Sequence, residues 1–499
     1  MEKSRFLEIV THIAECIKDS EFENHVFAVG GCVRDMVMDN PIKDIDLCID
    51  IPDGGIRLAE YMDKKNFVTG HPVTYPTYGT AMFRLNKFPN EEIECVQTRG
   101  EQYHDKESRN PQVTFADMSE DCVRRDLTIN ALYMGMTTQE IVDPTGKGLQ
   151  DISDGICRVT NEQPDIVFTD DPLRILRVIR FACRYDFSIE DGTMEAMKRN
   201  ADRLEIITQE RITDEFNKMM ASKDPARALD LLRYCGAFKY VLPEMIPTFD
   251  MGQNKYHFGT VWEHTSKVVD NMRTPLFDDF DDDWKRCLMV AAVLHDIGKI
   301  RTKSVGIDGN VHFYAHEAAG VRLATEVMVR MKYSNSDIKK VTFLIENHMR
   351  TKSWKEDIVS HKQYGFNHLA YDCGDENRLK ALLTLIHADN EAHAKGYCLP
   401  TNARQVYNRI MSTEAVKMFG YKLPITGDDV MEAVGIGPCE DVKHYLRHCL
   451  NLAIKDPGIT KAKCIYHITH DKVRRSYSGR EFKAVVDRIR RERRENAKS

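Results

Sequence analysis

The sequence contains no long apolar segment and no closely spaced cysteine pair. None of its stretches approaches the ~18 uninterrupted apolar residues of a membrane-spanning helix. The 14 cysteines include no Cys-x-x-Cys pair, so in a chain of this length we expect them to be reduced and structural. Residues 1–19 are amphipathic and mixed in charge, and they lack the basic start and apolar run of a secretion signal. These features lead us to expect a cytoplasmic protein.

An overall excess of positive charge is also missing, because the net charge is −7. The charge is uneven, however. Residues 471–499 carry 11 Lys or Arg and 5 Asp or Glu, a net of +6, which leaves −13 for the rest of the chain. A basic end on an acidic body suits local contact with RNA phosphates. A solvated, frayed C-terminal helix explains the same pattern equally well.

A chain of 499 residues is long for a single hydrophobic core, so we expect two to four domains. Its character changes near Asp143. Before that residue, β-like runs alternate with helical stretches, and after it helical periodicity dominates. The β-like runs are residues 26–29, 45–49, 81–85 and 93–96. We therefore predict an α+β protein in which a mixed α/β head precedes an elongated all-α remainder. The predicted limits are 1–145 for the head, 146–250 for a helical neck, 251–400 for a body and 401–499 for a tail.

A glycine pair and an arginine follow the first β-like run. Residues 26–29 lead into Gly30 and Gly31, and we expect a helix to begin at Val33. Glycines let backbone N–H groups approach a phosphate closely, and a helix N-terminus favours negative charge. Arg34 can add a bidentate phosphate contact. The segment is therefore a candidate phosphate-binding turn.

Two aspartates, Asp44 and Asp46, occupy the next β-like run. Residues two apart on a strand share one face and lie about 7 Å apart along the backbone. Carboxylates this close can share two divalent ions ~3.5–4 Å apart, one activating a hydroxyl and the other neutralising a leaving pyrophosphate. Glu94, on a later β-like run, is a candidate third carboxylate. An Asp-x-Asp pair alone is common on surfaces, and it is the preceding glycine turn that favours a catalytic Mg²⁺ site.

The glycine turn and the two aspartates together resemble the head of the class II nucleotidyltransferases, which include CCA-adding enzymes and bacterial poly(A) polymerases. Residues 124–132, 170–182 and 210–216 resemble that family's later motifs in the same order. The sequence departs from the pattern at Leu127, where Phe is usual, and at Asp170, where Glu is usual. The resemblance implies a nucleotide-binding set of Gly30, Gly31, Arg34, Arg125, Asp126, Asn130, Asp171, Arg174, Arg177 and Arg180.

Four arginines, Arg174, Arg177, Arg180 and Arg184, fall within about 120° of one face of a predicted helix. A salt-bridged exposed face would normally explain them, but the motif context favours triphosphate and base contacts. Asp171 and Arg174 are three apart, so we expect them to be neighbours on that helix. A carboxylate accepts hydrogen bonds and a guanidinium donates them. Such a pair fits cytosine and adenine and leaves polar groups unpaired against uracil and guanine, a role that the resemblance also implies.

A second candidate site combines histidines with acidic residues. His295 and Asp296 follow an apolar helical run and precede Gly298, which would expose the pair at a helix end. Imidazole and carboxylate together suit a mid-row divalent metal, which lowers the pKa of bound water and drives phosphoester hydrolysis. The ordered histidines and acids resemble the HD metal-dependent phosphohydrolase domains. That resemblance implies the ligands His264, His295, Asp296 and Asp389, with His316 and His348 completing a two-metal version.

The metal at this second site is predicted to be a divalent transition metal or Mg²⁺. A helical body whose histidines no longer bind metal is the alternative, and motif specificity favours the metal site. We expect His257, His361 and His387 to be structural. Residues 423–431 also resemble a segment that follows HD domains in bacterial-type CCA-adding enzymes, which extends the resemblance to about Ile468.

The resemblance implies a tRNA nucleotidyltransferase that adds or repairs the 3′-terminal CCA of tRNA from CTP and ATP without a nucleic-acid template. The HD domain would trim phosphates from damaged ends. A poly(A) polymerase of the same fold is the alternative, but residues 75–83 lack the basic stretch of those enzymes and residues 101–111 look more like the CCA-adding branch. CC-only and A-only addition stay open, as does a phosphohydrolase acting on RNA ends.

Overall fold

The computed structural model describes residues 1–76, 79–102, 112–253, 259–307, 309–351, 362–394 and 402–470. The chain divides into two compact units. The first comprises residues 1–274, 281–346 and 392–397, and the second comprises residues 275–280, 347–391 and 398–499. Two sequence features, the basic segment 471–499 and most of segment 101–111, lie outside the described residues. No helix in the described ranges is long and apolar enough to cross a membrane.

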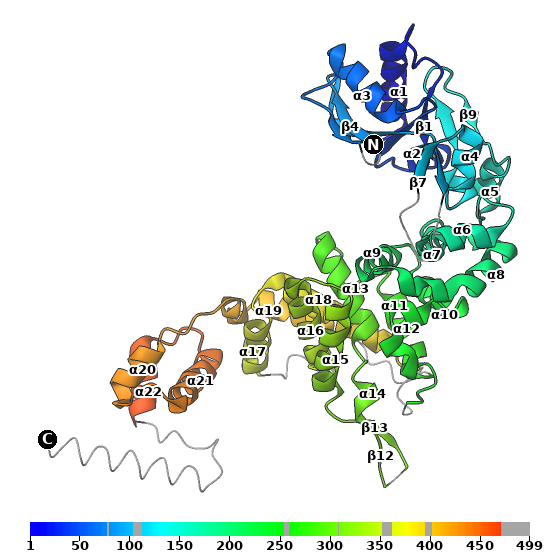
Figure 1. Ribbon diagram of the computed structural model, residues 1–499. Coiled ribbons are helices and arrows are strands. Elements are labelled where there is room, and N and C mark those ends of the chain that lie inside the picture. The colour runs from blue at the N-terminus through cyan, green and yellow to red at the C-terminus, as the bar shows by residue number, and fades with distance from the viewer. Residues whose placement is uncertain are drawn as a thin grey trace. The chain divides into compact units, whose positions relative to one another are not determined.

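The first unit begins with a mixed seven-stranded sheet, drawn in blue to cyan in Figure 1. Its strand order is β3-β4-β5-β2-β1-β8-β9, and only β2 and β5 run parallel to each other. The four β-like runs of the sequence fall on β1, β2, β4 and β5, so those predictions are confirmed. The strands are β1 (Val26–Val29), β2 (Ile45–Ile49), β3 (Val73–Tyr75), β4 (Thr80–Leu85), β5 (Phe88–Gln97), β8 (Tyr133–Gly135) and β9 (Ile141–Val142).

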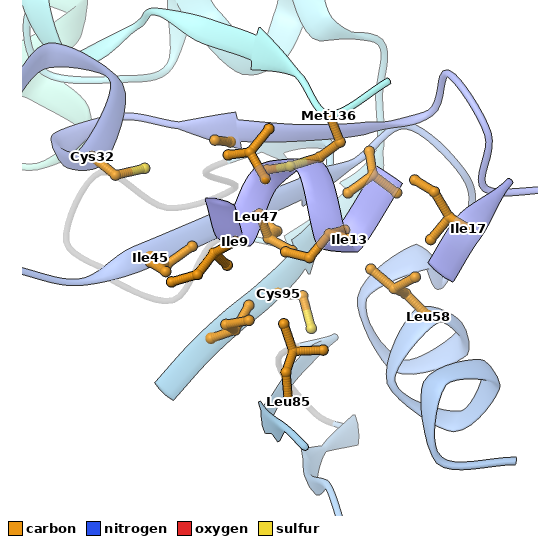
Figure 2. Close-up of a cluster of buried hydrophobic side chains, with 14 of the residues drawn as sticks. Ile9, Ile13, Ile17, Cys32, Ile45, Leu47, Leu58, Leu85, Cys95 and Met136 are labelled. Atoms are coloured by element: carbon orange, nitrogen blue, oxygen red, sulfur yellow. The ribbon is translucent and has the colours of Figure 1, made fainter. Parts of the chain in front are cut away.

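Helix α1 (Lys3–Ile17) covers this sheet because its apolar residues recur every three or four positions and form one buried face. Figure 2 shows Ile9 and Ile13 of α1 beside Ile45 and Leu47 of β2, with Ile17 further along the same helix. These side chains are fully or almost fully buried in one cluster. Burial of each stabilises the head by about 1.5–3 kcal/mol. The other head helices are α2 (Gly31–Val37), α3 (Gly54–Lys64) and α4 (Met118–Val123), and a separate hairpin consists of β6 (Arg99–Gln102) and β7 (Gln112–Phe115).

The chain after β9 is mainly helical, as predicted, with two short two-stranded sheets that the sequence did not indicate. These sheets pair β10 (Ile156–Cys157) with β11 (Ser188–Ile189) and β12 (Lys303–Val305) with β13 (Val311–Phe313). The helices of the first unit are α5 (Gly148–Asp154), α6 (Pro164–Asp170), α7 (Leu173–Tyr185), α8 (Asp191–Asn200), α9 (Gln209–Met220), α10 (Pro225–Tyr234), α11 (Phe238–Val241), α12 (Val261–Asn271), α13 (Asp282–Leu294), α14 (Lys299–Thr302) and α15 (His316–Arg330), followed by α16 (Asn335–Asn347), whose last residue begins the second unit.

The described part of the second unit contains helices and no strand. Its last three helices bury a small apolar core of their own, which includes Val430, Cys449 and Cys464. The 13 described cysteines are all free, and only Cys439 is exposed, which agrees with the expectation of reduced, structural thiols. The helices are α17 (Gln363–Cys373), α18 (Glu376–Glu391), α19 (Ala403–Met411), α20 (Gly427–Val434), α21 (Glu440–Lys455) and α22 (Lys461–His470).

Candidate active sites

The parallel pairing of β2 with β5 brings the predicted catalytic carboxylates together. Asp46 and Glu94 are direct partners in the register of the two strands. Asp44 lies one residue before β2 rather than on it, and it is exposed, as is Glu94. The prediction that Asp44 and Asp46 share one strand face is therefore not met, because Asp44 lies at the end of the preceding loop and the strand partner of Asp46 is Glu94.

The electrostatics of Asp46 indicate a cation site. Partial burial raises its pKa, and the neighbouring carboxylates of Glu94 and Asp44 raise it further, to about 6. The guanidinium of Arg125 acts in the opposite direction. Like charges that are held together in this way favour either a proton or a metal cation. Carboxylate oxygens are ligands that Mg²⁺ and other hard divalent cations prefer, so the residues present fit such an ion.

The glycine turn stands directly beside these carboxylates in the sheet, since β1 pairs with β2. Gly30 has φ +72° and ψ −122°, a conformation that only glycine adopts readily. Helix α2 begins at Gly31, two residues earlier than predicted. A Cβ atom at Gly30 would lie 3.6 Å from Nη1 of Arg125 and 3.6 Å from the carbonyl of Asn130. Arg125 therefore lies against the turn.

Arg34 does not lie open to a phosphate as the sequence suggested. It is 4% exposed. Its Nε and Nη2 donate to the carboxylate of Asp35 at 2.9–3.0 Å, and its Nη1 donates to Oδ1 of Asn130. Tyr185 of α7 donates its hydroxyl to the same Asp35 carboxylate at 2.8 Å. The Asp35 carboxylate thus joins α2 to the helical neck, and the donors of the Arg34 guanidinium are directed at protein partners.

Asp126 connects the head to the same neck helix. Its Oδ1 accepts from the side chain of Asn130 at 3.0 Å, and its Oδ2 accepts from Nε of Arg177 at 2.7 Å. Burial opposes ionisation of Asp126, but Arg177 and the hydrogen bond from Asn130 hold its pKa well below the usual range. Three residues of the predicted nucleotide-binding set are therefore joined in one charged network.

The predicted neighbours Asp171 and Arg174 do not share a helix. Asp171 has an extended backbone (φ −139°) between α6 and α7, and α7 begins two residues later. The residue before a proline is sterically pushed out of the helical conformation, and Pro172 follows here. The Asp171 carboxylate accepts from Nη2 of Arg211 at 2.9 Å, whereas Arg174 donates to the carbonyl of Val167 at 3.2 Å.

The arginine stripe of α7 is largely neutralised by carboxylates from other elements. Arg177 pairs with Asp126 at 2.6 Å and Arg180 pairs with Glu215 at 2.7 Å. Arg184 lies 3.9 Å from Asp35. Arg174 and Arg180 are buried. Three arginines of this face are thus paired with carboxylates of the head and of the neighbouring neck helix α9, and the contacts of the stripe with triphosphate and base stay a prediction.

The HD pair occupies the end of α13, as predicted, but it is buried. His295 is 0% exposed and Asp296 is 2% exposed, so the expectation of an exposed pair was wrong. Gly298 explains the close packing, because a Cβ atom there would lie 1.9 Å from the carbonyl of His316. The turn after α13 therefore presses directly against the start of α15, and a larger residue at position 298 would force the two apart.

Three histidines converge on Asp296. The distances from their Nε2 atoms to its carboxylate are 3.7 Å for His264, 3.2 Å for His295 and 3.5 Å for His316. Their Nδ1 atoms face the backbone carbonyls of Ala392, Ala292 and Phe313 at 2.9–3.3 Å. A hydrogen on each Nδ1 would be donated to that carbonyl, which leaves the Nε2 lone pair directed inward. This donor set fits a divalent metal ion of the transition series.

Sequence reasoning missed Lys299, three residues after Asp296. It is 3% exposed, and its ammonium donates to the Asp296 carboxylate at 2.7 Å and to Gln253. Burial tends to raise the pKa of Asp296, but Lys299 and His295 hold it well below the usual range. The i,i+3 spacing of an acid and a lysine was the available signal.

The two remaining expected ligands, His348 and Asp389, belong to the second unit. Each is buried, at 0% and 1% exposure, and their participation stays a prediction. His387 is half-buried, and desolvation lowers its pKa. His257 and His361 lie outside the described residues.

Comparison with known proteins agrees with this division into sites. Three family models match: the poly A polymerase head domain over residues 26–158, the probable RNA and SrmB-binding site of polymerase A over residues 186–248, and the HD domain over residues 256–395.

Curated relatives and solved structures point to the same proteins. A multifunctional CCA protein of Neisseria meningitidis is 32% identical over 61% of this chain and 68% of its own length. An A-adding tRNA nucleotidyltransferase of Deinococcus radiodurans is 28% identical over 84% of this chain and 89% of its own length. The crystal structure of the Bacillus stearothermophilus CCA-adding enzyme in complex with CTP has the same fold, with a TM-score of 0.61 and 20% identity over 93% of this chain and 96% of that one. The chain therefore belongs to the tRNA nucleotidyltransferase family, the CCA-adding branch of the class II nucleotidyltransferases, with an HD domain.

Proposed function

We propose that this protein adds the 3′-terminal C, C and A of tRNA from CTP and ATP without a nucleic-acid template. The observation that carries the proposal is the direct strand pairing of Asp46 with Glu94, with Asp44 beside them. Three carboxylates at one point, next to a glycine turn, are suited to nucleotidyl transfer rather than to RNA binding alone. The family membership supports the same reaction.

The proposed catalytic residues are Asp44, Asp46 and Glu94, which would hold Mg²⁺. When bound, such ions activate the attacking 3′-hydroxyl and neutralise the leaving pyrophosphate. The protein's own contribution is to fix Asp46 and Glu94 on two paired strands, with Asp44 one residue before the first of them. Because the strands hold them together before any ligand binds, their mutual repulsion favours the ion-bound state over the apo state.

The triphosphate is proposed to bind at the turn formed by Gly30 and Gly31. The backbone at Gly30 brings the first turn of α2 close to the carboxylates, and Arg125 adds a positive charge at the same place. Arg34, Asn130, Asp126 and Arg177 belong to the proposed nucleotide-binding set through the hydrogen-bonded network between head and neck. In that network they position the two parts of the site, and the guanidinium groups of Arg34 and Arg177 are paired with Asp35 and Asp126. Arg180, the last member of the set, pairs with Glu215 within the neck.

Selection of cytosine and adenine is proposed to lie with Asp171 and Arg174. Although the two do not share a helix, Arg174 donates its backbone N–H to the Asp171 carbonyl at 3.0 Å, so they are held close. Arg211 restrains the Asp171 carboxylate. A fixed acceptor beside a fixed donor matches the amino group and ring nitrogen of C and A. With U or G in the same place, the acceptor and the donor would have no matching partner. Buried polar groups left unpaired in this way are how polar sites discriminate strongly.

The HD domain is proposed to remove phosphates, such as a 2′,3′-cyclic phosphate, from damaged RNA ends. The proposed metal ligands are His264, His295, Asp296, His316, His348 and Asp389. When bound there, a divalent metal supplies a hydroxide for phosphoester hydrolysis near neutral pH. Convergence of three Nε2 atoms on Asp296 supports this role. Because its proposed substrate is tRNA, we propose that the protein acts in the cytoplasm.

A second candidate function is the addition of A alone. The A-adding relative from Deinococcus radiodurans aligns over more of this chain than the multifunctional CCA protein does. A poly(A) polymerase of the same fold remains the further alternative within the family.

One incorporation assay separates these functions. The protein receives tRNA lacking its CCA end, or tRNA ending in CC, with each NTP separately and with CTP plus ATP. Addition of C, C and A in that order to the first substrate supports the proposal. Extension of the CC-ending substrate alone would establish the A-adding function, a long A tract would establish a poly(A) polymerase, and no extension of either substrate would contradict nucleotidyl transfer.

A further inference from the structure

Asp121 on α4 is a fully buried carboxylate that the proposed reaction has not so far involved. Its Oδ1 accepts from Nε and Nη2 of Arg124 at 3.0 and 2.6 Å, and from the backbone N–H of Arg99 at 3.2 Å. Its Oδ2 accepts from Nε and Nη2 of Arg125 at 3.0 and 2.9 Å and from the Tyr133 hydroxyl at 2.6 Å. A buried carboxylate is costly unless it is paired, and here both oxygens are fully engaged.

These contacts fix the orientation of Arg125. Asp121 binds the edge of the guanidinium formed by Nε and Nη2, and the Tyr133 oxygen also accepts from Nε at 3.1 Å. The guanidinium stands over the Tyr133 ring, 5.3 Å from its centroid. The remaining nitrogen, Nη1, is the one that lies at the Gly30 turn, 3.6 Å from the position of a Cβ atom there. Only this end of Arg125 faces the proposed triphosphate site.

Tyr133 ties this arrangement to the turn itself. It is the first residue of β8 and the strand partner of Val29, the last residue before Gly30. Both belong to a small buried cluster with Cys48 of β2 and Cys122 of α4. The carboxylate strand, the glycine turn and the Arg125 clamp therefore share one packed scaffold, so a displacement of Arg125 would require breaking that cluster or the ion pair with Asp121.

We propose that Asp121 and Tyr133 are positioning residues for nucleotide transfer, holding Arg125 so that its Nη1 binds an anionic oxygen of the incoming triphosphate at the Gly30 turn. This inference rests on the proposed function. Held in place before the nucleotide binds, the guanidinium loses no rotamer freedom on binding, and its charge stands where negative charge gathers during transfer. Without the clamp, the same arginine would occupy many conformations.

A purely structural role for Asp121 is the competing explanation, because it also binds Arg124 and the Arg99 backbone. A double-mutant cycle separates the two roles. We would measure kcat and KM for CTP incorporation into tRNA lacking CCA, using wild type, Asp121→Asn, Tyr133→Phe, Arg125→Ala and the two double variants. Asp121→Asn sets an NH₂ donor against two guanidinium groups, and Tyr133→Phe removes only the hydroxyl.

We expect Asp121→Asn to lower kcat/KM about 100-fold, because misplaced binding groups cost that much. Tyr133→Phe should lower it about tenfold, the equivalent of about 1.5 kcal/mol for a hydrogen bond to a charged group. In the Arg125→Ala background, each substitution should change kcat/KM by less than about twofold, since the group that they position is gone. Tyr133→Phe carries the test if Asp121→Asn does not fold.

Asp151→Asn is the matched control. Asp151 is 3% exposed and accepts from Arg158 at 3.2 Å and from Thr128 at 2.7 Å, without a contact to Arg125. Its effect should be the same with and without Arg125. Equal losses from Asp121→Asn or Tyr133→Phe in both backgrounds would overturn the inference while leaving the proposed function intact. A wild-type protein that incorporates no nucleotide would overturn both.

Discussion

The head and the HD domain both gather acidic residues, but they balance the negative charge differently. In the head, Asp46 stands opposite Glu94, and its pKa rises to about 6 because of burial and the neighbouring carboxylates. In the HD domain, burial also acts to raise the pKa of Asp296, but Lys299 and His295 hold it well below its usual range. In the head, the neighbouring carboxylates repel one another until a cation binds. In the HD domain, the Lys299 ammonium already balances the charge of Asp296. The balance of charge around the carboxylates, and not their number, therefore determines how strongly each site needs the positive charge of a bound metal ion.

The strongest test of the head site removes its aspartates. Asp44→Ala with Asp46→Ala should lower CTP incorporation by at least about 10³-fold, because the ligands of the proposed Mg²⁺ are lost. Binding of tRNA, measured by filter retention, should persist.

Glu94→Ala and Glu92→Ala provide a matched pair on one strand. Glu94 faces Asp46, whereas Glu92 makes an exposed ion pair with Arg84 at 2.8 Å. Only the first substitution should abolish incorporation. Equal losses from both would show that β5 contributes stability and not a metal ligand.

Substitutions at the HD site should abolish its proposed hydrolysis without affecting nucleotide incorporation by the head. His295→Ala with Asp296→Ala should abolish metal-dependent release of phosphate from an RNA ending in a 2′,3′-cyclic phosphate, because the centre of the ligand set is gone. CTP incorporation by the same protein should stay within about twofold of wild type, since the domains carry separate chemistry. His387→Ala, on the same helix as Asp389, is the control and should retain hydrolysis. Hydrolysis unchanged in the double variant would sink the proposed HD activity.

The glycine turn should show a smaller loss. Gly30→Ala places a side chain at φ +72° and should cost about 1–3 kcal/mol of unfolding free energy, with incorporation falling about tenfold as the turn shifts from the carboxylates. Gly70→Ala is the matched control, because Gly70 also has positive φ, at +74°, and has open space around it. It should cost stability without lowering incorporation. The measurements are chemical denaturation and initial rates. Loss of incorporation in both variants would assign the effect to stability alone.

The smallest expected effect is a gain in stability. The pKa of Asp46 in the folded protein, about 6, lies above its ordinary value of 3.8. The proton on Asp46 thus stabilises the fold fully below about pH 4, and this stabilisation is lost as the pH rises through about 6. Asp46→Asn should therefore unfold at higher denaturant concentration than wild type at about pH 8 without metal, by about 1 kcal/mol after allowance for partial exposure.

The stability difference between wild type and Asp46→Asn should shrink towards zero at about pH 4. Added Mg²⁺ should stabilise wild type by mass action and stabilise Asp46→Asn less. A wild-type protein as stable as the variant at high pH would mean that the three carboxylates do not repel one another.

Local sequence predicted much of this architecture because its determinants are local. The β-like runs became strands because short apolar segments bounded by turn residues have few other conformations. The conformation of Asp171, by contrast, differs from the prediction although its cause is local. Pro172 was visible in the sequence, and its steric effect on the preceding residue is sufficient to take Asp171 off the helix. Lys299 was likewise visible, three residues after Asp296, and its pairing was missed.

Other features depended on contacts with distant segments. Arg34 was expected to bind phosphate, but its neighbour Asp35 and the distant Asn130 take its donors. The burial of His295 and Asp296 depends on α15 packing against the turn at Gly298. Such packing is set by segments far apart in the chain, so no window of sequence contains it.

By itself, the sequence determined the residue types and their order: a glycine that can adopt positive φ before a helix, acids on two strand-forming runs, and histidines spaced along helices. Only the tertiary structure decided which of them meet. The β2–β5 register sets Asp46 opposite Glu94, and the packing around Asp121 aims Arg125 at the Gly30 turn. The physical reason is that register, burial and ion pairing depend on contacts between distant segments, whereas turn and strand preferences are properties of a few adjacent residues.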